Sequence, residues 1–303
     1  MPDLKGVGAS RKNAAQVLMF QDREIGRLLD GLRAAGTLDN AVVVVASDNG
    51  GCYLSGSVNH PLRGVKGSFF EGGVRVPAFV YSETETLIPE EARGTQYDGL
   101  FHMVDWLPTL LSLGAGGSSS SALAALGDQG LDGVDQWAAL IGQAPPPRTE
   151  AVLGYNEEVF SRSRLSTTVV TAPNGPKGAF RSGKWKIVMQ EYCVGWYRSS
   201  LDEGVEVMGE PGCSGEAMCT SCHCYSTVTA PDEAAKGSYL FDLEEDPGEE
   251  VNVWDKFPEV AASLVERWLE LSTEENTPVL WAPEDGGSYQ AWRDAGNWVV
   301  PWL

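Results

Sequence analysis

Three polar side chains in one stretch of the chain could hold a cation and an oxyanion together. Asp48 and Asn49 follow the apolar run Val42–Val45, and Lys66 comes eighteen positions after Asp48. Carboxylate and amide oxygens suit Ca²⁺ or Mg²⁺, and a lysine ammonium beside such a cation would share the charge of a bound anion. Because Asp-Asn-Gly-Gly is also a common turn sequence, the wider context has to favour a site.

That context consists of further blocks in a fixed order. Pro-Leu-Arg-Gly-Val-Lys ends at Lys66, and Glu-Gly-Gly-Val-Arg begins at Glu71. The segment resembles the second half of a sulfatase, most closely the arylsulfatase B-like branch. The resemblance implies that Asp48 and Asn49 are ligands of an active-site Ca²⁺, rather than Mg²⁺. It also implies that Lys66 is a catalytic, substrate-binding residue that contacts the sulfate, and that the substrate is an aryl sulfate or a sulfated sugar.

The nucleophile of that family is missing from this sequence. Sulfatases use a formylglycine made from the cysteine of a Cys-x-Pro-x-Arg motif, and none of the six cysteines here has proline two positions later. Asp48 and Asn49 also supply only two of the six or more oxygens that Ca²⁺ takes. Since the covalent route needs a nucleophile, we expect these 303 residues to be inactive alone.

Three interpretations therefore stay open. The sequence is a truncated part of a sulfatase, which we favour, or a non-catalytic remnant that binds a partner or a sulfated glycan. A phosphoryl hydrolase of the alkaline phosphatase superfamily is the third, although the asparagine beside Asp48 and the block around Lys66 fit sulfatases better.

A long helix and two apolar runs must position these residues. The β-branched run Val42–Val45 predicts a strand buried on both faces of an α/β sheet, and Ala78–Val80 predicts a second strand. Apolar spacing predicts a helix from Ser10, its expected cap, to Gly36, which should cover one face of the sheet. The resemblance implies an α/β, alkaline phosphatase-like sulfatase fold with an incomplete central sheet and flanking helices.

The histidines are weaker candidates. His60 lies in the loop before Lys66, where a plain loop residue is favoured over a place on the substrate rim. His102 and Asp105 lie three apart in a helix predicted over Asp98 to Leu113. Both are expected to be structural, because the resemblance assigns them no catalytic role.

Three consecutive prolines, Pro145–Pro147, predict a domain boundary. Residues 1–147 would be the C-terminal part of a sulfatase catalytic domain, and residues 148–303 a C-terminal subdomain. Alternating apolar residues in the subdomain predict a small antiparallel sheet, with two strands hinged at Ser182-Gly183. A helix from Phe257 to Leu271 should lie on this sheet.

Two further features of the subdomain concern charge and turns. Lys184 and Lys186 alternate with Trp185 and Ile187, which predicts a half-exposed strand. The carboxylates near Asp246 lack the spacing of an EF-hand and predict a solvated turn.

The subdomain also carries a Cys-rich insertion at about 193–236. Irregular spacing among Gly, Ser and Thr favours disulfides over a Zn²⁺ site, with free thiols as the third possibility. The clustered cysteines are Cys193, Cys213, Cys219, Cys222 and Cys224, and the tail is rich in tryptophan, with Trp281, Trp292, Trp298 and Trp302.

The net charge of −20 excludes some partners. Such a surface repels phosphate backbones and anionic lipids, so neither nucleic acid nor a membrane surface is an expected partner. The sequence has no run of 18 apolar residues, so no membrane span is predicted, and its N-terminus has no apolar segment typical of a signal peptide. The cysteine density nevertheless favours a secreted or lysosome-like compartment for the intact parent, and the oligomeric state is left open.

Overall fold

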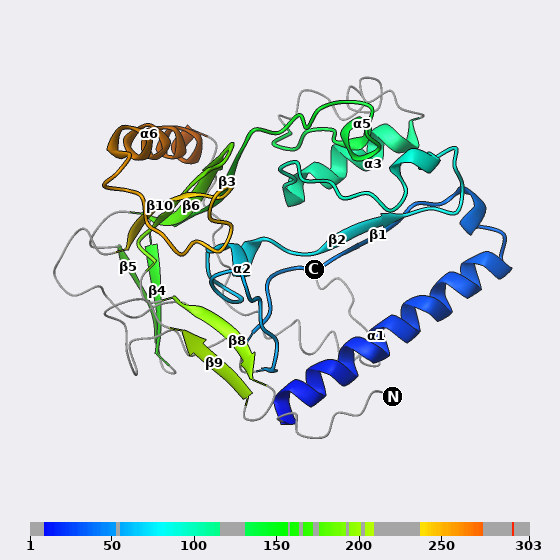
Figure 1. Ribbon diagram of the computed structural model, residues 1–303, viewed down its shortest axis with the longest axis horizontal. Coiled ribbons are helices and arrows are strands. Elements are labelled where there is room, and N and C mark those ends of the chain that lie inside the picture. The colour runs from blue at the N-terminus through cyan, green and yellow to red at the C-terminus, as the bar shows by residue number, and fades with distance from the viewer. Residues whose placement is uncertain are drawn as a thin grey trace.

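The structure is a computed structural model that describes residues 9–52, 55–115, 131–156, 158–163, 166–171, 176–191, 194–200, 204–208, 237–274 and 293. Figure 1 shows a long helix and a strand pair on one side of the molecule and a sheet capped by a second long helix on the other. The helices are α1 (Ala9–Ala34), α2 (Glu71–Val74), α3 (Trp106–Gly114), α5 (Trp137–Leu140) and α6 (Pro258–Glu274). The strands of the two main sheets are β1 (Val43–Ala46), β2 (Ala78–Tyr81), β3 (Glu150–Asn156), β6 (Lys177–Ser182), β7 (Trp185–Met189) and β10 (Ser238–Asp242).

Helix α1 confirms the predicted N-terminal helix. Gly36 has a φ of +67°, Thr37 N donates to Leu32 O at 3.1 Å and Gly36 N donates to Arg33 O at 3.0 Å. This pattern is a Schellman ending, which favours glycine at that place. The predicted cap is wrong, because the helix already contains Ala9 and Ser10.

The apolar side of α1 is not buried as expected. None of its residues is buried, and the apolar ones that are 58–65% exposed are Val17, Leu18, Phe20 and Leu28. The helix therefore lies beside the rest of the described chain without being covered by it.

Strands β1 and β2 form an antiparallel pair, with Val43 opposite Tyr81 and Ala46 opposite Ala78. The second strand confirms the predicted run from Ala78. The prediction that the first is buried on both faces is wrong, because β1 is half-buried and Ala46 is exposed. Within the described residues the pair has no further strand at either edge, so an α/β sheet is present only in part.

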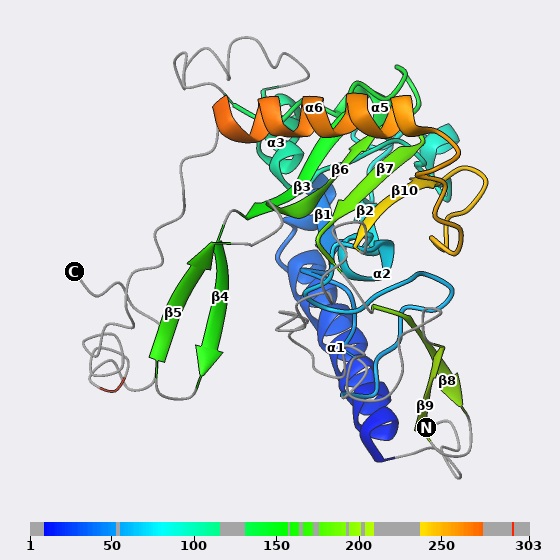
Figure 2. The same cartoon turned by 90° about the vertical axis from the view of Figure 1, so that its left-hand side faces the viewer.

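The C-terminal sheet is antiparallel, in the order β10-β7-β6-β3, and it is packed on both faces. Figure 2 shows α6 lying across one face. The buried side chains of that layer are Phe180, Ile187, Leu240, Ala261, Leu264 and Trp268. The other face packs onto Phe70 through Ala179, Val188, Tyr239 and Phe241. The predicted small antiparallel sheet with a helix on it is confirmed.

The hairpin β6–β7 turns at Gly183, whose φ is +55°, and this confirms the predicted hinge. Lys184 is 37% exposed and pairs with Asp242 at 2.5 Å. Lys186 is 0% exposed, so the prediction of a half-exposed strand is wrong there. The reason is that both faces of this sheet are covered, so either parity of β7 points into a buried layer.

Other elements match in part. Of the helix predicted over Asp98 to Leu113, only α3 is α-helical, and a 3₁₀ turn, Met103–Asp105, precedes it. The turn at Asp246 is a closed loop rather than a cation site, because the carboxylate of Asp246 accepts from the backbone N of Glu250 and Val251 at 3.0 and 2.8 Å.

Two strand pairs were not predicted. One joins β4 (Glu158–Ser163) to β5 (Ser166–Thr171), and the other joins β8 (Trp196–Ser200) to β9 (Gly204–Met208). The five clustered cysteines and the four tryptophans of the tail lie outside the described residues. The domain boundary at 147 stays a prediction, and no helix of the described chain is long and apolar enough to cross a bilayer.

Candidate functional site

The two loops that carry the predicted site residues lie against each other at the carboxyl end of β1. Lys66 N donates to Gly51 O at 3.1 Å, and Gly50 N donates to Gly73 O at 2.9 Å. Asp48 and Lys66 are exposed, and Asn49 is half-buried. The fold therefore brings the two loops together and leaves the side chains of all three residues accessible, as a ligand site requires.

Asn59 braces the two loops. Its Oδ1 accepts from Gly51 N at 2.7 Å, and its Nδ2 donates to Gly51 O and to Gly64 O, both at 3.0 Å. One side-chain amide thus fixes the turn after Asn49 and the segment before Lys66. The sequence analysis missed this residue, because an asparagine in a loop is common for reasons of turn geometry alone.

Glycines allow three backbone segments to meet beneath these loops. A Cβ on Gly50 would lie 1.8 Å from Gly72 O, a Cβ on Gly72 would lie 2.5 Å from Arg63 O, and one on Gly73 would lie 2.1 Å from Ser68 O. No side chain fits at those distances, so Gly50, Gly72 and Gly73 serve the close approach of the backbone segments.

Arg63 fastens the segment before Lys66 to the C-terminal sheet. Its side chain is 2% exposed, and its guanidinium carbon lies 3.9 Å from the ring centre of Phe70 and 4.8 Å from those of Trp196 and Tyr239. Its Nε donates to Val194 O at 2.7 Å. A guanidinium enclosed by aromatic faces is held by cation–π attraction that burial strengthens.

A buried group of one cation and two carboxylates fastens the segment after Lys66. Lys186 Nζ lies 2.7 Å from Glu71 Oε1 and 2.8 Å from Glu249 Oε1, and none of the three side chains is more than 3% exposed. Glu249 Oε2 also accepts from Glu71 N at 2.6 Å. We call Glu71, Lys186 and Glu249 the buried triad.

The two carboxylates that share one ammonium have different pKa values. Burial raises the pKa of Glu249 to about 7, against the attraction of Lys186 and with the repulsion of Glu71 added. Burial also opposes ionisation of Glu71, but Lys186 outweighs it and the pKa of Glu71 lies below its ordinary value. The pKa of Lys186 is raised, because the two carboxylates outweigh its burial. The triad therefore binds a proton at Glu249 in mildly acidic solution.

The donors at the loops fit a hard cation in type but not in number. The carboxylate of Asp48 and the amide of Asn49 are the oxygen ligands that Ca²⁺ prefers, and Ca²⁺ takes six to eight of them. Ser47 Oγ donates to Asn49 O at 2.9 Å and closes the turn between them. Within the described residues no cluster of three His, Cys, Asp or Glu side chains forms a metal site, so further ligands would have to come from elsewhere.

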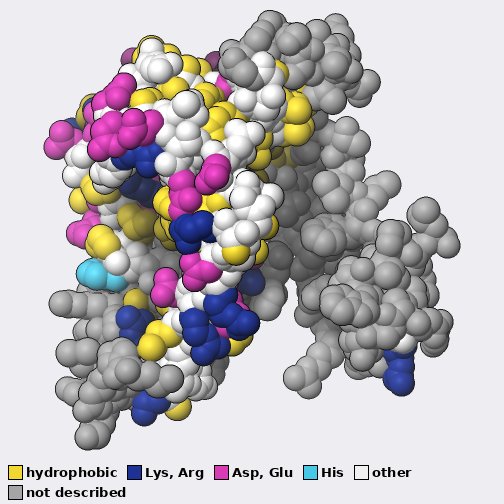
Figure 3. Space-filling view, turned by 90° about the vertical axis from the view of Figure 1, so that its right-hand side faces the viewer, with side chains coloured by type: hydrophobic (Ala, Val, Ile, Leu, Met, Phe, Trp, Pro, Cys, Tyr) yellow, Lys and Arg dark blue, Asp and Glu magenta, His cyan; other side chains and the backbone are white. Residues whose placement is uncertain are grey.

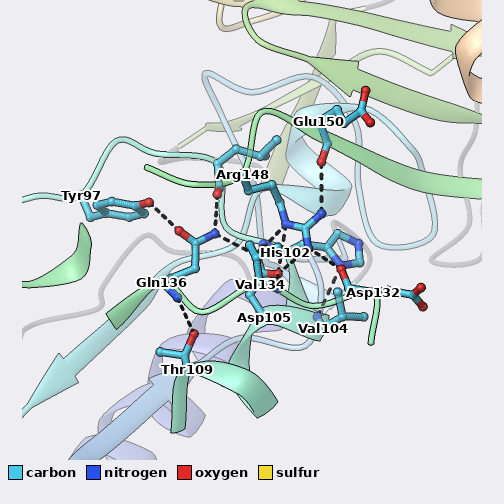
Figure 4. A network of polar contacts seen from close by, with 11 residues as sticks. Tyr97, His102, Val104, Asp105, Thr109, Asp132, Val134, Gln136, Arg148 and Glu150 are labelled. Atoms are coloured by element: carbon cyan, nitrogen blue, oxygen red, sulfur yellow. Dashed lines mark hydrogen bonds and ion pairs between the residues drawn. The ribbon is translucent and has the colours of Figure 1, made fainter. Parts of the chain in front are cut away.

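A second polar network, shown in Figure 4, is centred on Asp105. Its carboxylate is 0% exposed and accepts two bonds from Arg148 Nε at 2.8 and 3.0 Å, one from Val134 N at 2.9 Å and one from Gln136 Nε2 at 2.9 Å. Burial opposes ionisation, but these donors outweigh it, and the pKa of Asp105 lies below its ordinary value. The carboxylate is thus held by Arg148, Gln136 and the backbone of Val134, and its structural role stays a prediction.

His102 belongs to the same network. Its backbone N donates to Asp105 Oδ2 at 2.9 Å, and burial, followed by the repulsion of Arg148, lowers the pKa of its imidazole. It lines a cavity of about 340 Å³ together with Arg148, Tyr155 and Ser272. Arg148 is already paired with Asp105, so the described lining residues include no free arginine or lysine that could attract an anion.

The long loop also carries His60 and Cys52. His60 is exposed, and its place on a substrate rim stays a prediction. Cys52 is buried. The predicted bonding of the cysteines at 193–224 stays a prediction.

Comparison with known proteins extends these observations. The sulfatase family matches residues 6–116. Arylsulfatase J of Mus musculus is 25% identical over 302 residues, which cover 96% of this chain and 46% of the relative. Arylsulfatase A of Bos taurus is 30% identical over 254 residues, which cover 82% and 40%.

Among solved structures, Ps i-CgsB in complex with k-i-k-neocarrahexaose superposes with a TM-score of 0.59 and 21% identity, covering 97% of this chain and 49% of that one. The chain belongs to the sulfatase family and has its alkaline phosphatase-like α/β fold. It spans about half the length of the relatives it matches.

Proposed function

We propose that this chain supplies the cation-binding and sulfate-binding part of the active site of a sulfuric ester hydrolase. The observation that supports the proposal is the backbone bond from Lys66 N to Gly51 O, which joins the segment of Lys66 to the loop that carries Asp48 and Asn49. Sulfatase relatives along most of the chain support the reaction class. Arylsulfatases and a neighbour solved with an oligosaccharide favour an aryl sulfate or a sulfated sugar as the substrate.

Each residue has one role in this proposal. Asp48 and Asn49 would hold Ca²⁺, which when bound would neutralise charge on the sulfate and polarise its oxygens. Lys66 would place its ammonium against a sulfate oxygen and stabilise the negative charge that grows in the transition state. The exposure of Asp48 and Lys66 suits groups that must meet an incoming ligand.

The test is binding by the 303-residue chain itself. We expect weak Ca²⁺ binding, with a Kd of about 10⁻³ M or higher because few ligands are present, and Asp48→Ala should abolish it in a calorimetric titration. Asp246→Ala is the matched control, because that carboxylate closes a surface turn. Ca²⁺ binding that survives Asp48→Ala would contradict the assigned site.

The nucleophile is a separate part of the proposal. Because the sequence lacks the Cys-x-Pro-x-Arg motif, we propose that these residues alone do not hydrolyse sulfate esters and that the active enzyme includes a polypeptide that carries the motif. An assay with 4-nitrophenyl sulfate should show no turnover above buffer. Turnover by the purified chain, lost in Lys66→Ala, would overturn this part and keep the assigned role of Lys66.

A non-catalytic remnant is the second candidate, and the missing nucleophile favours it. Such a protein would still bind a sulfated glycan, but the addition of a motif-bearing sulfatase segment would restore no activity. Restored turnover would decide for the hydrolase. A secreted or lysosome-like compartment is proposed with either function, supported by the cysteine density.

A further inference from the structure

We propose that Lys186 is a positioning residue for the sulfate site, because its buried ammonium fixes the loop that carries Lys66 to the C-terminal sheet. The inference rests on the proposed function, in which Lys66 contacts sulfate. It adds a residue on β7 that is 120 positions away in the chain and has no contact with the ligand.

The first step is the contact between the two parts of the molecule. Glu71 opens α2, five residues after Lys66, and Lys186 is the second residue of β7. Their side chains meet at 2.7 Å with 3% and 0% exposure. Because both partners are removed from water, neither can replace the other with a water molecule. Loss of this ion pair would therefore leave a buried charge without a partner.

The second step runs from Glu71 to the site. Gly72 N donates to Arg63 O at 2.6 Å, and Gly73 O accepts from Gly50 N at 2.9 Å. The backbone that directly follows Glu71 is therefore bonded to the segment before Lys66 and to the turn after Asn49. A shift of Glu71 would move both loops together.

The third step concerns the backbone conformations open to the Lys66 loop in the absence of contacts with the sheet. Gly64 and Gly67 flank Lys66 with φ values of +93° and +84°, and two more glycines follow Glu71. Such a segment has many alternative conformations, so its folded geometry depends on contacts with a rigid neighbour. The sheet is that neighbour, because it is packed on both faces.

Lys186 is the decisive member of this contact. Without its ammonium, the carboxylates of Glu71 and Glu249 would face each other in a buried space, and Glu249 Oε1 would lose its 2.8 Å ion pair with Lys186. Removal of the central cation from a buried ionic group is more disruptive than removal of a surface charge. We expect the glycine-rich loop, rather than the sheet, to change its conformation in response.

The test measures Lys66 directly in the full 303-residue chain. Trace acetylation followed by mass spectrometry gives the reactivity of the Lys66 amine, and inorganic sulfate as the probe should protect it. For Lys186→Met we expect the sulfate concentration for half-protection to rise about tenfold, as for other residues that orient a ligand-binding group. Lys184→Met is the matched control, because this lysine of the same hairpin pairs at the surface with Asp242 and should leave the value unchanged.

Hydrogen exchange provides a second measurement. Amides of residues 63–74 should exchange at least about tenfold faster in Lys186→Met, while those of β10 and α6 keep their rates, which separates loop positioning from general loss of stability. If Lys186→Met does not fold, Glu71→Gln takes its place, because it keeps the shape and weakens the same bond.

The outcomes separate the inference from the proposed function. Two values are measured in Lys186→Met and in Glu71→Gln: the sulfate concentration for half-protection of Lys66 and the amide exchange rates of residues 63–74. If both equal those of the unchanged chain, the positioning role is overturned. If sulfate does not protect Lys66 in the unchanged chain, the proposed function fails, and loop exchange alone then decides the inference. An equal effect of Lys184→Met would also overturn it, because a general effect of charge would then explain the result.

Discussion

The two ends of the molecule bury their apolar residues to very different extents. In the C-terminal part, Trp268 of α6 is 1% exposed, and Phe180 and Leu240 of the sheet are 0% exposed. In the N-terminal part, α1 has no buried residue and Phe79 of β2 is 54% exposed. Figure 3 shows the side of the molecule on which apolar side chains reach the surface among charged ones.

The difference shows which part of the described chain has a fully covered core. The C-terminal sheet has a buried layer on each face, whereas β1 is half-buried, β2 is partly exposed and α1 has no buried residue among the described ones. The candidate site lies on loops of the incompletely packed part, and its geometry is fixed from the other part through Arg63 and the buried triad. Stability and site geometry should therefore respond most strongly to changes in the C-terminal layers.

The largest effect is expected at Trp268. Its indole donates from Nε1 to Gly154 O at 3.1 Å and meets the ring of Tyr155 edge-on at 5.4 Å. Trp268→Ala should lower the free energy of unfolding by about 3–5 kcal/mol, measured by urea denaturation. Trp268→Phe should lower it less, and equal losses would show that the indole is not packed as described.

The next effect is expected at Asp105, which links the two parts through Arg148. Asp105→Ala leaves the Arg148 guanidinium, whose side chain is 13% exposed, without its carboxylate and should cost about 3 kcal/mol in the same measurement. Asp132→Ala is the control, because Asp132 is exposed and contributes its backbone O to Arg148. A loss below about 1 kcal/mol at Asp105 would mean that the network holds little of the fold together.

A smaller effect is expected from pH through Glu249. Its pKa of about 7 lies above the ordinary 4.5, so its contribution to stability is full below pH 4.5 and is lost as the pH rises through 7. We therefore compare the free energy of unfolding of the unchanged chain with that of Glu249→Gln. The difference should shift by about 1–3 kcal/mol in favour of the unchanged chain as the pH falls from 8 to 5.

Comparison of the two chains at each pH removes other titrations from this result. The pKa of His102 is lowered from 6.5, so its contribution falls as the pH falls through its folded value, in the opposite direction. Glu71 and Asp105 have lowered pKa values and lose their contributions only below 4.5 and 3.8. A difference between the two chains that does not depend on pH would contradict the assignment to Glu249.

The smallest effect is expected on α1. Leu18→Ser and Phe20→Ser should change the free energy of unfolding by less than about 0.5 kcal/mol each, because both side chains are more than half exposed. Urea denaturation measures this as well. A loss above about 1 kcal/mol would show that this face is covered in solution, and the contrast between the two ends would then disappear.

Local patterns predicted much of the fold. The helix ending at Gly36, the hinge at Gly183 and the helix on the C-terminal sheet each depend on neighbouring residues, through a positive φ or an apolar period of 3.6 or 2. The failures concern burial. The run Val42–Val45 predicted a strand buried on both faces, and the alternation around Lys186 predicted a half-exposed strand. Both predictions were wrong because a local pattern does not say how many layers cover a sheet.

The sequence by itself determined the family and three candidate residues, since the blocks around Asp48, Asn49 and Lys66 are contiguous and ordered along the chain. Only the tertiary structure decided what holds them: Asn59 between the loops, the aromatic enclosure of Arg63, and Glu71 joined to Lys186 and Glu249. The physical reason is that the triad joins residues far apart in the chain, with Glu71 and Lys186 separated by 115 positions, and that its strength comes from desolvation. Both the pairing and the desolvation exist only once the sheet has packed against the loop.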